Sequence, residues 1–344
     1  MAPKKQLCLG IETTAHTFGA SVVESTGKIL SNEKDAFQTA RGGMIPFQVA
    51  QHHVEICDAV ITKALAAAGA EITDIDVIAI SSSPGIGPML RIGCTAARSL
   101  AGLYKKPLVP VNHCIAHLEI GRLVSKAKDP VLLYASGANT QVIAFEGGKY
   151  RVFGETLDIG VGNFLDTFAR HAKLGFPGGP KIEKLAAACK NKEKLVELPY
   201  CVKGMDVTFG GMLTNIQQKY DRREYALEDI SYAVQETAFA MLVEISERAL
   251  AHTGKTELVL GGGVACNKRL QEMCRIMCEE RGAQCYCPEN QFLVDNAAMI
   301  AWTGLLEYNA GIKIEWQHAA QLKKDPYLRT DEADIPWRLQ PNTL

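Results

Sequence analysis

The sequence lacks any hydrophobic run long enough to cross a membrane. A transmembrane helix needs about 20 predominantly apolar residues in succession, and no window of the 344 residues reaches that length. The first residues, MAPKKQLCLGIE, pass from lysines into an apolar segment without the hydrophobic region and cleavage site of a signal peptide. We therefore expect no membrane partner and a cytoplasmic location, with the nucleus as a second location.

The eleven cysteines include no CxxC pair. Most fall within apolar periods, as Cys266, Cys274 and Cys278 do, so we interpret them as reduced, mostly buried thiols of an intracellular protein. Cys285 and Cys287 in AQCYCPEN would share one face of a strand, a spacing that is a poor metal signature by itself. Neither a disulfide framework nor a zinc finger is indicated.

An excess of charge of one sign is also absent. Lys and Arg number 37 and Asp and Glu 38, so the net charge of −1 gives no electrostatic argument for nucleic acid or a membrane surface. The densest basic cluster, KNKEK at 190–194, is interrupted by Glu193. A hydrophobic content of 47% describes a globular protein, and 344 residues exceed one ordinary core, so we expect two domains.

Two segments share one series of strands and turns. Residues 6–33 read as strand, small polar turn, strand, glycine turn at 26–27 and third strand. Residues 130–156 repeat that series, with a polar turn around Ser136 and a Gly-Gly turn at 147–148. The repetition predicts a duplicated domain, in which each half begins with a hairpin whose tip can cradle phosphate through free backbone N–H groups.

Helices and strands alternate in the rest of the chain. Residues 47–70 have helical periodicity ending at Gly69, and residues 75–81 form a continuous apolar strand. On this helix, His52 and His53 are expected at the surface or in packing. Further helices are expected at 94–104, at 227–254 and after Asp295. This alternation indicates an α/β architecture.

Two histidines, His113 and His117, lie four residues apart in VNHCIAHLEIGRL. On a helix they would point the same way, which suits a shared cation and equally suits ordinary packing. Zinc peptidases use this spacing with a glutamate after the first histidine. Cys114 occupies that place, so the general base of a peptidase is missing. The spacing alone leaves metal binding and packing open.

The loop LVLGGGVACN at 258–267 matches neither GxGxxG nor GxxxxGK[ST]. Its three glycines would either form only a tight turn or leave backbone amides free to bind an anion at the N-terminus of the following helix. Together with the two hairpin tips, the loop resembles the layout of the actin, sugar kinase and heat-shock ATPase (ASKHA) superfamily, with an active-site cleft between two lobes. We expect lobes at 1–130 and 131–344, with the segment from about 296 packing back on the first lobe.

Two carboxylates remain open to interpretation. Asp295 precedes NAAMIAW, so capping its own helix is the first interpretation. Asp166 in NFLDTFAR lies on a helix without an evident local partner, and it could accept ribose hydroxyls in a cleft or face solvent.

Six motifs in order resemble the universal tRNA threonylcarbamoyltransferase family, the O-sialoglycoprotein endopeptidase-like catalytic subunit of the KEOPS complex. They are VNHCIAHLEIGRL, LYASGANTQVIAF, GETLDIGVGNFLDTFAR, VKGMDVTFGGMLTNI, LGGGVACNKRLQEM and DNAAMIAWTG. The resemblance runs from about Leu7 to Arg338, and KGMDV and RTDEADIPWR are similar to the archaeal and eukaryotic cytosolic branch.

The resemblance implies an acyltransferase. It would move the threonylcarbamoyl group from threonylcarbamoyl-adenylate, made by a separate synthase, to the N6 amine of adenosine 37 in tRNAs that read ANN codons, releasing AMP. One divalent cation per subunit, iron or zinc, would act as a Lewis acid. The implied partners are tRNA and KEOPS subunits, especially a small kinase-like ATPase.

The resemblance also implies the site residues. The metal ligands would be His113, His117, Tyr134 and Asp295. Substrate and nucleotide contacts would come from Tyr134, Ala135, Ser136, Gly137, Ala138, Asp166, Gly179, Glu183 and Asn267. Glu12 and His16, on the first hairpin tip, are candidates for catalysis. The chain has Ala138 and Gly210 where the family has glycine and serine; at a positive φ the alanine would be strained.

The sequence leaves three other functions open. A small-molecule kinase or ATPase of the ASKHA superfamily, without a tRNA step, is the alternative; the pairing of a glycine loop with HxxxH favours the transferase, because such kinases hold Mg²⁺ through phosphate and carboxylates. A metallopeptidase lacks its glutamate at position 114. A binding subunit without catalysis is the third.

Overall fold

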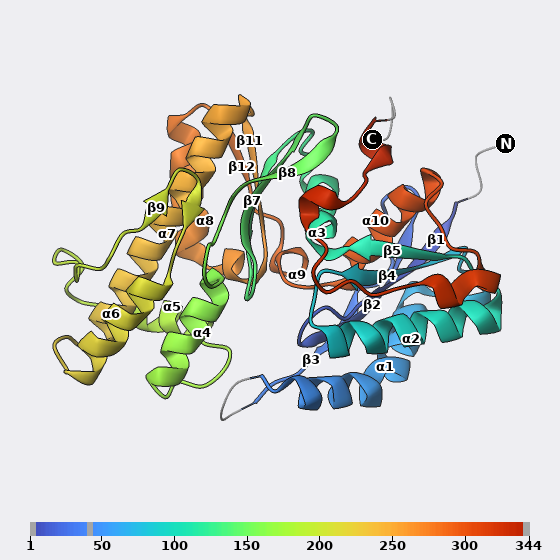
Figure 1. Ribbon diagram of the computed structural model, residues 1–344, viewed down its shortest axis with the longest axis horizontal. Helices are drawn as coiled ribbons and strands as arrows, with labels where there is room; N and C mark the ends of the chain where they lie inside the picture. The colour runs from blue at the N-terminus through green and yellow to red at the C-terminus, as the bar shows by residue number, and fades with distance from the viewer. Residues whose placement is uncertain (1–4, 40–43, 340–344) are drawn as a thin grey trace.

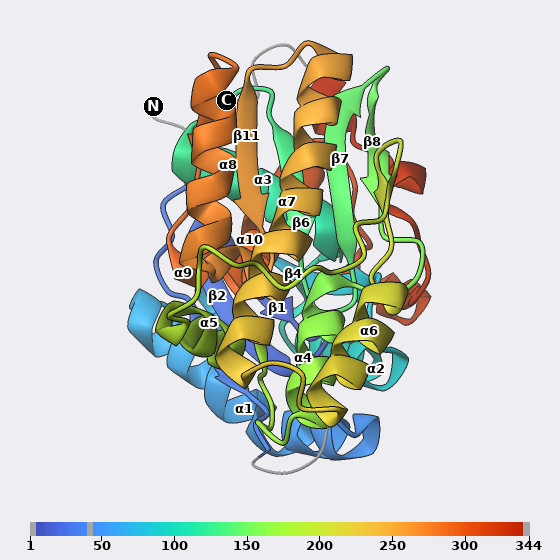
Figure 2. The same ribbon diagram turned by 90° about the vertical axis from the view of Figure 1, so that its left-hand side faces the viewer.

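The computed structural model describes residues 5–39 and 44–339, which form two five-stranded sheets with helices on both faces of each (Figures 1 and 2). Five layers follow one another: α1 and α2, the first sheet, α3 and α10, the second sheet, and the helices α4 to α8. Within the described ranges, no helix is long and apolar enough to cross a membrane.

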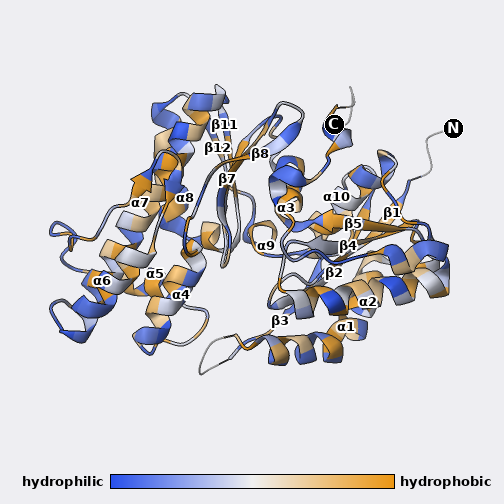
Figure 3. Ribbon diagram, in the orientation of Figure 1, coloured by the Kyte–Doolittle hydropathy of each residue, from blue (hydrophilic) through white to orange (hydrophobic). Residues whose placement is uncertain are grey.

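The first sheet has the order β3-β2-β1-β4-β5, with β1–β2–β3 antiparallel and β4 and β5 parallel to β1. Its strands are β1 (Leu7–Glu12), β2 (Thr17–Glu24), β3 (Glu33–Ala36), β4 (Val77–Ser83) and β5 (Leu108–Asn112), and its helices are α1 (Pro46–Ala68), α2 (Gly87–Tyr104) and α3 (His113–Ser125). Figure 3 shows β1 and β5 as largely hydrophobic, as expected for strands of a sheet covered on both faces.

The second sheet repeats this topology in the order β8-β7-β6-β11-β12. Its strands are β6 (Val131–Ala135), β7 (Thr140–Glu146), β8 (Lys149–Glu155), β11 (Glu257–Gly261) and β12 (Gln284–Tyr286), and β9 (Val202–Lys203) and β10 (Asp206–Val207) form a separate small hairpin. The helices of this half are α4 (Val161–His171), α5 (Gly179–Ala188), α6 (Gly210–Asp221), α7 (Leu227–Thr253), α8 (Lys268–Glu280) and α9 (Asn290–Leu293).

The last long helix, α10 (Ala297–Asn309), lies against the first sheet rather than the second. The approach is close because both surfaces carry glycine. A Cβ on Gly10 of β1 would lie 2.4 Å from the backbone nitrogen of Ala301, and a Cβ on Gly304 would lie 2.3 Å from the side-chain Cβ of Ala79. After three short 3₁₀ helices (Trp316–Gln321, Thr330–Glu332 and Pro336–Leu339), the described chain ends beside α3, where Trp337 Nε1 donates to Glu119 at 2.9 Å.

Several sequence predictions are confirmed and two need correction. The second meander, the helix ending at Gly69 with φ 63°, and the long helix α7 are present. The third strand of the first meander is Glu33–Ala36, whereas Ile29 makes only an isolated bridge with Val23. Helix α2 begins at Gly87 rather than at 94, since Pro88 in its first turn suits a helix start. All eleven cysteines are free.

The division into lobes at residue 130 is our proposal, and its outermost residues, 1–4 and 340–344, lie outside the described residues. This boundary separates the two sheets in the chain: α3 is the last element before it, and β6, the first strand of the second sheet, follows it. The two halves share the apolar layer that holds α3, α10 and the tail.

Candidate metal centre and nucleotide site

His113 and His117 lie on the first turns of α3 and face one carboxylate from the far end of the chain. Asn112 caps the helix, since its side chain accepts hydrogen bonds from the backbone nitrogens of Cys114 and Ile115. The Nε2 atoms of His113 and His117 lie 3.3 and 3.4 Å from Asp295 Oδ1. Within the described part of the chain, these residues form the one group of three metal-binding side chains whose donor atoms lie within 4.8 Å of one another.

Asp295 does not cap the helix that follows it, so the first interpretation of this residue was wrong. The cap of α10 is Asn296, whose Oδ1 accepts from Met299 N at 3.1 Å. The carboxylate of Asp295 is therefore free to face the two histidines.

Tyr134, at the end of β6, supplies a fourth donor atom. Its hydroxyl oxygen lies 3.1 Å from His113 Nε2, and its ring lies 4.8 Å from that of His117, measured between centroids. The phenol is buried, and burial raises its pKa. Two imidazoles, a carboxylate and a phenol oxygen that converge in this way fit a divalent transition metal.

Glu12 lies behind His113. Its Oε2 lies 3.0 Å from His113 Nδ1, while its Oε1 accepts from the backbone nitrogen and the hydroxyl of Thr14 at 2.7 and 2.5 Å. The carboxylate is fully buried. A carboxylate on Nδ1 fixes the proton there and turns the Nε2 lone pair toward the shared point. Glu12 is thus placed to orient a metal ligand, a role that the sequence did not suggest.

The acidic groups of the cluster stabilise positive charge on the histidines, and the histidines stabilise the negative charge of Asp295. Burial opposes protonation of His113, but the charges of Glu12, Tyr134 and Asp295 outweigh it and hold its pKa well above the usual value. Burial lowers the pKa of His117. Burial would raise the pKa of Asp295, yet the two histidines hold it well below the usual value. The Nδ1 atom of His117 is buried and has no partner among the described residues.

The turn between β6 and β7, residues 136–139, offers backbone amides to a ligand. Gly137 and Ala138 are exposed, and their amides donate to no group within the described ranges. The backbone nitrogens of Gly162 and Asn163 donate to the carbonyl oxygens of Ser136 and Gly137, which ties the turn to α4. Two free amides beside a helix N-terminus are suited to an anion.

The glycine loop adjoins the same turn. Gly262 has φ 90°, and a Cβ there would lie 2.3 Å from the carbonyl oxygen of Ala135. The two segments that the sequence indicated as phosphate-binding are thus in contact. Ala138 does not adopt a positive φ, so its methyl group brings no backbone strain. A Cβ on Gly210 would lie 2.8 Å from Asp158 Oδ2, so a serine there would require Asp158 to shift.

Asp166 on α4 has a local partner. Its Oδ1 accepts from Gly178 N at 2.7 Å, which ties α4 to the start of α5 at Gly179. Burial raises the pKa of this carboxyl. Asp166 is half-buried and bonded to the chain before α5, so it has the local partner that the sequence did not reveal.

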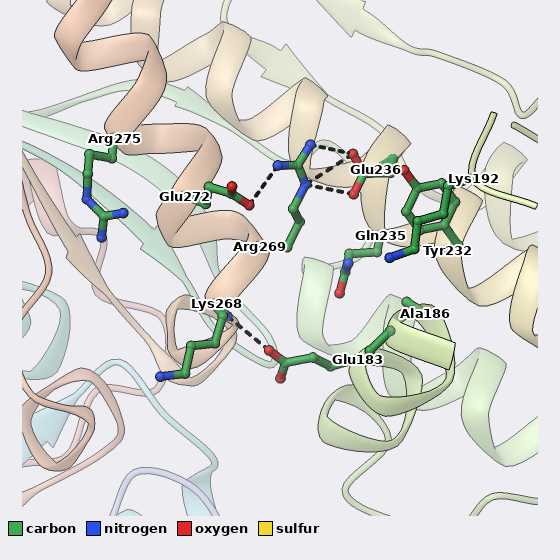
Figure 4. A pocket seen from close by; sticks show the side chains of 11 residues that line it. Glu183, Ala186, Lys192, Tyr232, Gln235, Glu236, Lys268, Arg269, Glu272 and Arg275 are labelled. Atoms are coloured by element: carbon green, nitrogen blue, oxygen red, sulfur yellow. Dashed lines mark hydrogen bonds and ion pairs between the residues drawn. The ribbon is translucent and has the colours of Figure 1, made fainter. Parts of the chain in front are cut away.

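A polar cavity of about 650 Å³ lies between α5, α7 and α8 (Figure 4). Glu183 and Gln235 lie on its wall, and Glu183 Oε1 accepts from Lys268 N at 2.9 Å. Asn267 does not line this cavity, and its amide is already used: Oδ1 caps α8, and Nδ2 donates to Gln235 at 3.0 Å. Sequence reasoning missed Gln235, which only its place in the α7 periodicity could have suggested.

His16 lies on the first tip, opposite the second lobe. Its ring packs edge-on against Phe176, with centroids 5.8 Å apart. His53 is buried and bonds the carbonyl of Ala15, which supports the same tip. Glu12 and His16 thus contact different parts of the structure, the former His113 and the latter Phe176.

Known proteins resemble the chain over most of its length. A family model described as tRNA N6-adenosine threonylcarbamoyltransferase matches residues 28–302. A tRNA N6-adenosine threonylcarbamoyltransferase of Thermococcus kodakarensis is 53% identical over 331 residues, which cover 96% of this chain and 99% of that protein. A probable bifunctional tRNA threonylcarbamoyladenosine biosynthesis protein of Methanocaldococcus jannaschii is 50% identical, covering 96% of this chain and 60% of that protein.

Solved structures support the fold. HypF of Thermococcus kodakarensis aligns with a TM-score of 0.62 at 14% identity, covering 90% of this chain and 48% of that one. Component A of the (R)-2-hydroxyglutaryl-CoA dehydratase of Acidaminococcus fermentans aligns with a TM-score of 0.54 at 14% identity, covering 92% and 99%. The predicted duplicated α/β fold of the ASKHA type is confirmed. The family match and the full-length identity together place the chain in the tRNA N6-adenosine threonylcarbamoyltransferase family, a family of transferase enzymes.

Proposed function

We propose that this protein transfers the threonylcarbamoyl group of threonylcarbamoyl-adenylate to the N6 amine of adenosine 37 in tRNAs that read ANN codons, with release of AMP. The proposal rests on the position of a group of metal-binding side chains next to a turn with free backbone amides. The donor atoms of His113, His117, Asp295 and Tyr134 converge at the end of β6, and the free amides of Gly137 and Ala138 follow directly after that strand. Family membership supplies the reaction class.

The four converging donors would hold one divalent cation, iron or zinc by the preference of this donor set. When bound there, the cation supplies Lewis-acid polarisation of a carbonyl. Glu12 keeps the Nδ1 proton of His113 in place, so that Nε2 faces the site as a lone pair.

The nucleotide part of the donor would lie along the second lobe. The amides of Gly137 and Ala138 would bind the phosphate, and the neighbouring Tyr134, Ala135 and Ser136 would contact the acyl part. Asp166 and Glu183 would accept ribose hydroxyls with the oxygens that their backbone partners leave free. Gly179, which has open space around it, and Asn267 would border the base.

The test is nucleoside mass spectrometry. The protein, candidate partner subunits, threonylcarbamoyl-adenylate and a tRNA that reads an ANN codon are incubated, and the tRNA is digested and analysed. We expect threonylcarbamoyladenosine at position 37 and none when adenosine 37 is replaced by guanosine. Nucleotide hydrolysis or small-molecule phosphorylation with unmodified tRNA would favour the kinase or ATPase alternative, and a peptide product would favour a peptidase.

We further propose that tRNA binding depends on partner subunits. Basic and acidic residues are balanced at 37 and 38, whereas tRNA affinity comes largely from Lys and Arg that neutralise phosphates. A small kinase-like ATPase and other KEOPS-type subunits would extend the RNA surface, and a separate synthase would supply the adenylate. The transfer assay at physiological salt, with and without the kinase-like subunit, tests this: saturable full activity of the isolated chain would contradict it.

A further inference from the structure

Four cysteines gather on one side of the second sheet, away from the histidine cluster. Cys274 and Cys278 lie one turn apart on α8 and are fully buried, while Cys285 and Cys287 lie on β12 and directly after it and are half-buried. The sulfur atoms of Cys285 and Cys287 are 4.0 Å apart, and the Cys285 thiol also interacts with that of Cys278.

The arrangement does not resemble a metal centre. Sulfurs that bind zinc lie about 3.8 Å apart on all sides, as a tetrahedron with bonds of about 2.3 Å requires. Among the described residues, only His113, His117 and Asp295 bring three such donor atoms within 4.8 Å of one another. The close contact of Cys285 and Cys287 is therefore better understood as a pair of thiols.

The two thiols have unequal surroundings. The contact with the Cys285 thiol lowers the pKa of Cys287 to about 7 against the effect of burial, and Arg275 of α8 adds to this. The same contacts with Cys278 and Cys287, together with burial, raise the pKa of Cys285. At neutral pH, Cys287 thus has thiolate character, whereas Cys285 keeps its proton.

We propose that Cys287 and Cys285 form a reversible redox pair that reacts with small-molecule disulfides. The Cys287 thiolate attacks one sulfur of the disulfide RSSR, forms the mixed disulfide Cys287–S–S–R and expels RS⁻, which takes a proton from water. Cys285 then loses its proton to water and attacks Cys287 Sγ, which forms the Cys285–Cys287 bond and expels the second RS⁻, and this RS⁻ also takes a proton from water. Counted from the two thiols, with the proton that Cys287 released on ionising included, the protein loses two electrons and two protons, and RSSR becomes two RSH.

The position in the fold permits this step. Residues two apart in an extended chain point to the same face, and β12 is a three-residue strand at the edge of the sheet. The sulfurs need to approach by about 2 Å to reach a bond length of about 2.05 Å, a movement that a short edge strand can accommodate. Arg275, which lines the cavity in Figure 4, places a positive charge near Cys287 that suits a disulfide carrying carboxylates.

Oxidised glutathione is a suitable probe. The full chain is treated at pH 7, free thiols are alkylated, and peptides are mapped by mass spectrometry. We expect a Cys285–Cys287 disulfide and no lasting glutathione adduct at Cys287. In Cys285→Ser, the mixed disulfide should stay on Cys287, and in Cys287→Ser, the pair should not oxidise. A stable adduct on wild-type Cys287 would overturn the proposal.

The exposed Cys201 is the internal control. Half-ionised Cys287 carries about 16 times more thiolate at pH 7 than a thiol with the reference pKa of about 8.5, and its lower nucleophilicity reduces the advantage to about threefold. Cys201→Ser should leave the Cys285–Cys287 product unchanged. If Cys285→Ser unfolds, the peptide map of the wild type still shows which cysteine pairs with Cys287. A disulfide of Cys287 with Cys278 would contradict the assigned pair.

Discussion

Residues 13–16 (the first tip) and 136–139 (the second tip) occupy equivalent places in the two sheets, each joining the first two strands of a meander. The first tip faces inward: Thr13 and Thr14 are buried, and Thr14 binds Glu12 behind His113. The second tip faces outward, with Gly137 and Ala138 exposed and their amides free.

The same hairpin thus has a different role in each half of the protein. In the first tip, the backbone nitrogen and the hydroxyl of Thr14 donate to the Glu12 carboxylate, which in turn supports the histidine pair. In the second, small side chains leave the backbone itself as the binding group. Side-chain composition at four positions therefore decides whether the turn supports a ligand site or forms one.

The largest effect is expected at the histidine pair, which the first tip supports through Glu12. His117→Ala should remove bound metal and lower transfer more than about 100-fold, because even the outer partners of metal ligands change affinity or activity by about 10–100-fold. Metal content by mass spectrometry and transfer rate measure this, with circular dichroism to check the fold. His52→Ala, on α1 in the outer layer, is the control. Retained metal with full turnover would contradict the site.

The role of the first tip is tested at Glu12. Glu12→Gln should lower metal affinity about 10–100-fold, because the amide cannot accept from both His113 Nδ1 and the two donors of Thr14. Competition with a metal chelator measures the affinity. Glu33→Gln, a surface carboxylate paired with Lys63, should behave like the wild type. Equal affinities of both variants would mean that Glu12 serves only in packing.

The second tip and its neighbours are tested through nucleotide affinity. Asp166→Asn keeps an acceptor for Gly178 N but removes the charge, so adenylate binding should weaken by about 1–3 kcal/mol. Calorimetry measures the dissociation constant. Asp206→Asn is a matched control, since Asp206 also accepts from a backbone nitrogen, that of Glu155. An unchanged constant for Asp166→Asn would exclude this carboxylate from the nucleotide site.

The smallest effect is expected at Ala138. Because its φ is not positive, Ala138→Gly relieves no strain and should destabilise the protein by about 0.4–1 kcal/mol through unfolded-chain entropy. Thermal unfolding gives the stability and calorimetry the adenylate affinity, which should change little. A large gain in affinity would show that the methyl group obstructs the phosphate.

The sequence by itself determined the local elements. Helix α1 ends at Gly69, Asn112 caps α3, and both histidines lie on one face, because capping and periodicity involve residues within one or two turns. The second meander was predictable for the same reason. The third strand of the first meander was not, because Glu33–Ala36 is an edge strand fixed by its pairing with β2 rather than by an apolar pattern.

Only the tertiary structure decided which distant groups meet. His117 and Asp295 are 178 positions apart, and His113 and Glu12 are 101 apart, so no local pattern relates them. The family resemblance, rather than spacing, suggested Asp295 and Tyr134. Asp295 and Asn296 are both good caps, and the choice between them depends on the histidines that Asp295 faces. In the same way, the contact of Cys285 with Cys278 depends on how α8 packs on β12, since sheet pairing and helix packing act between residues that the chain order keeps apart.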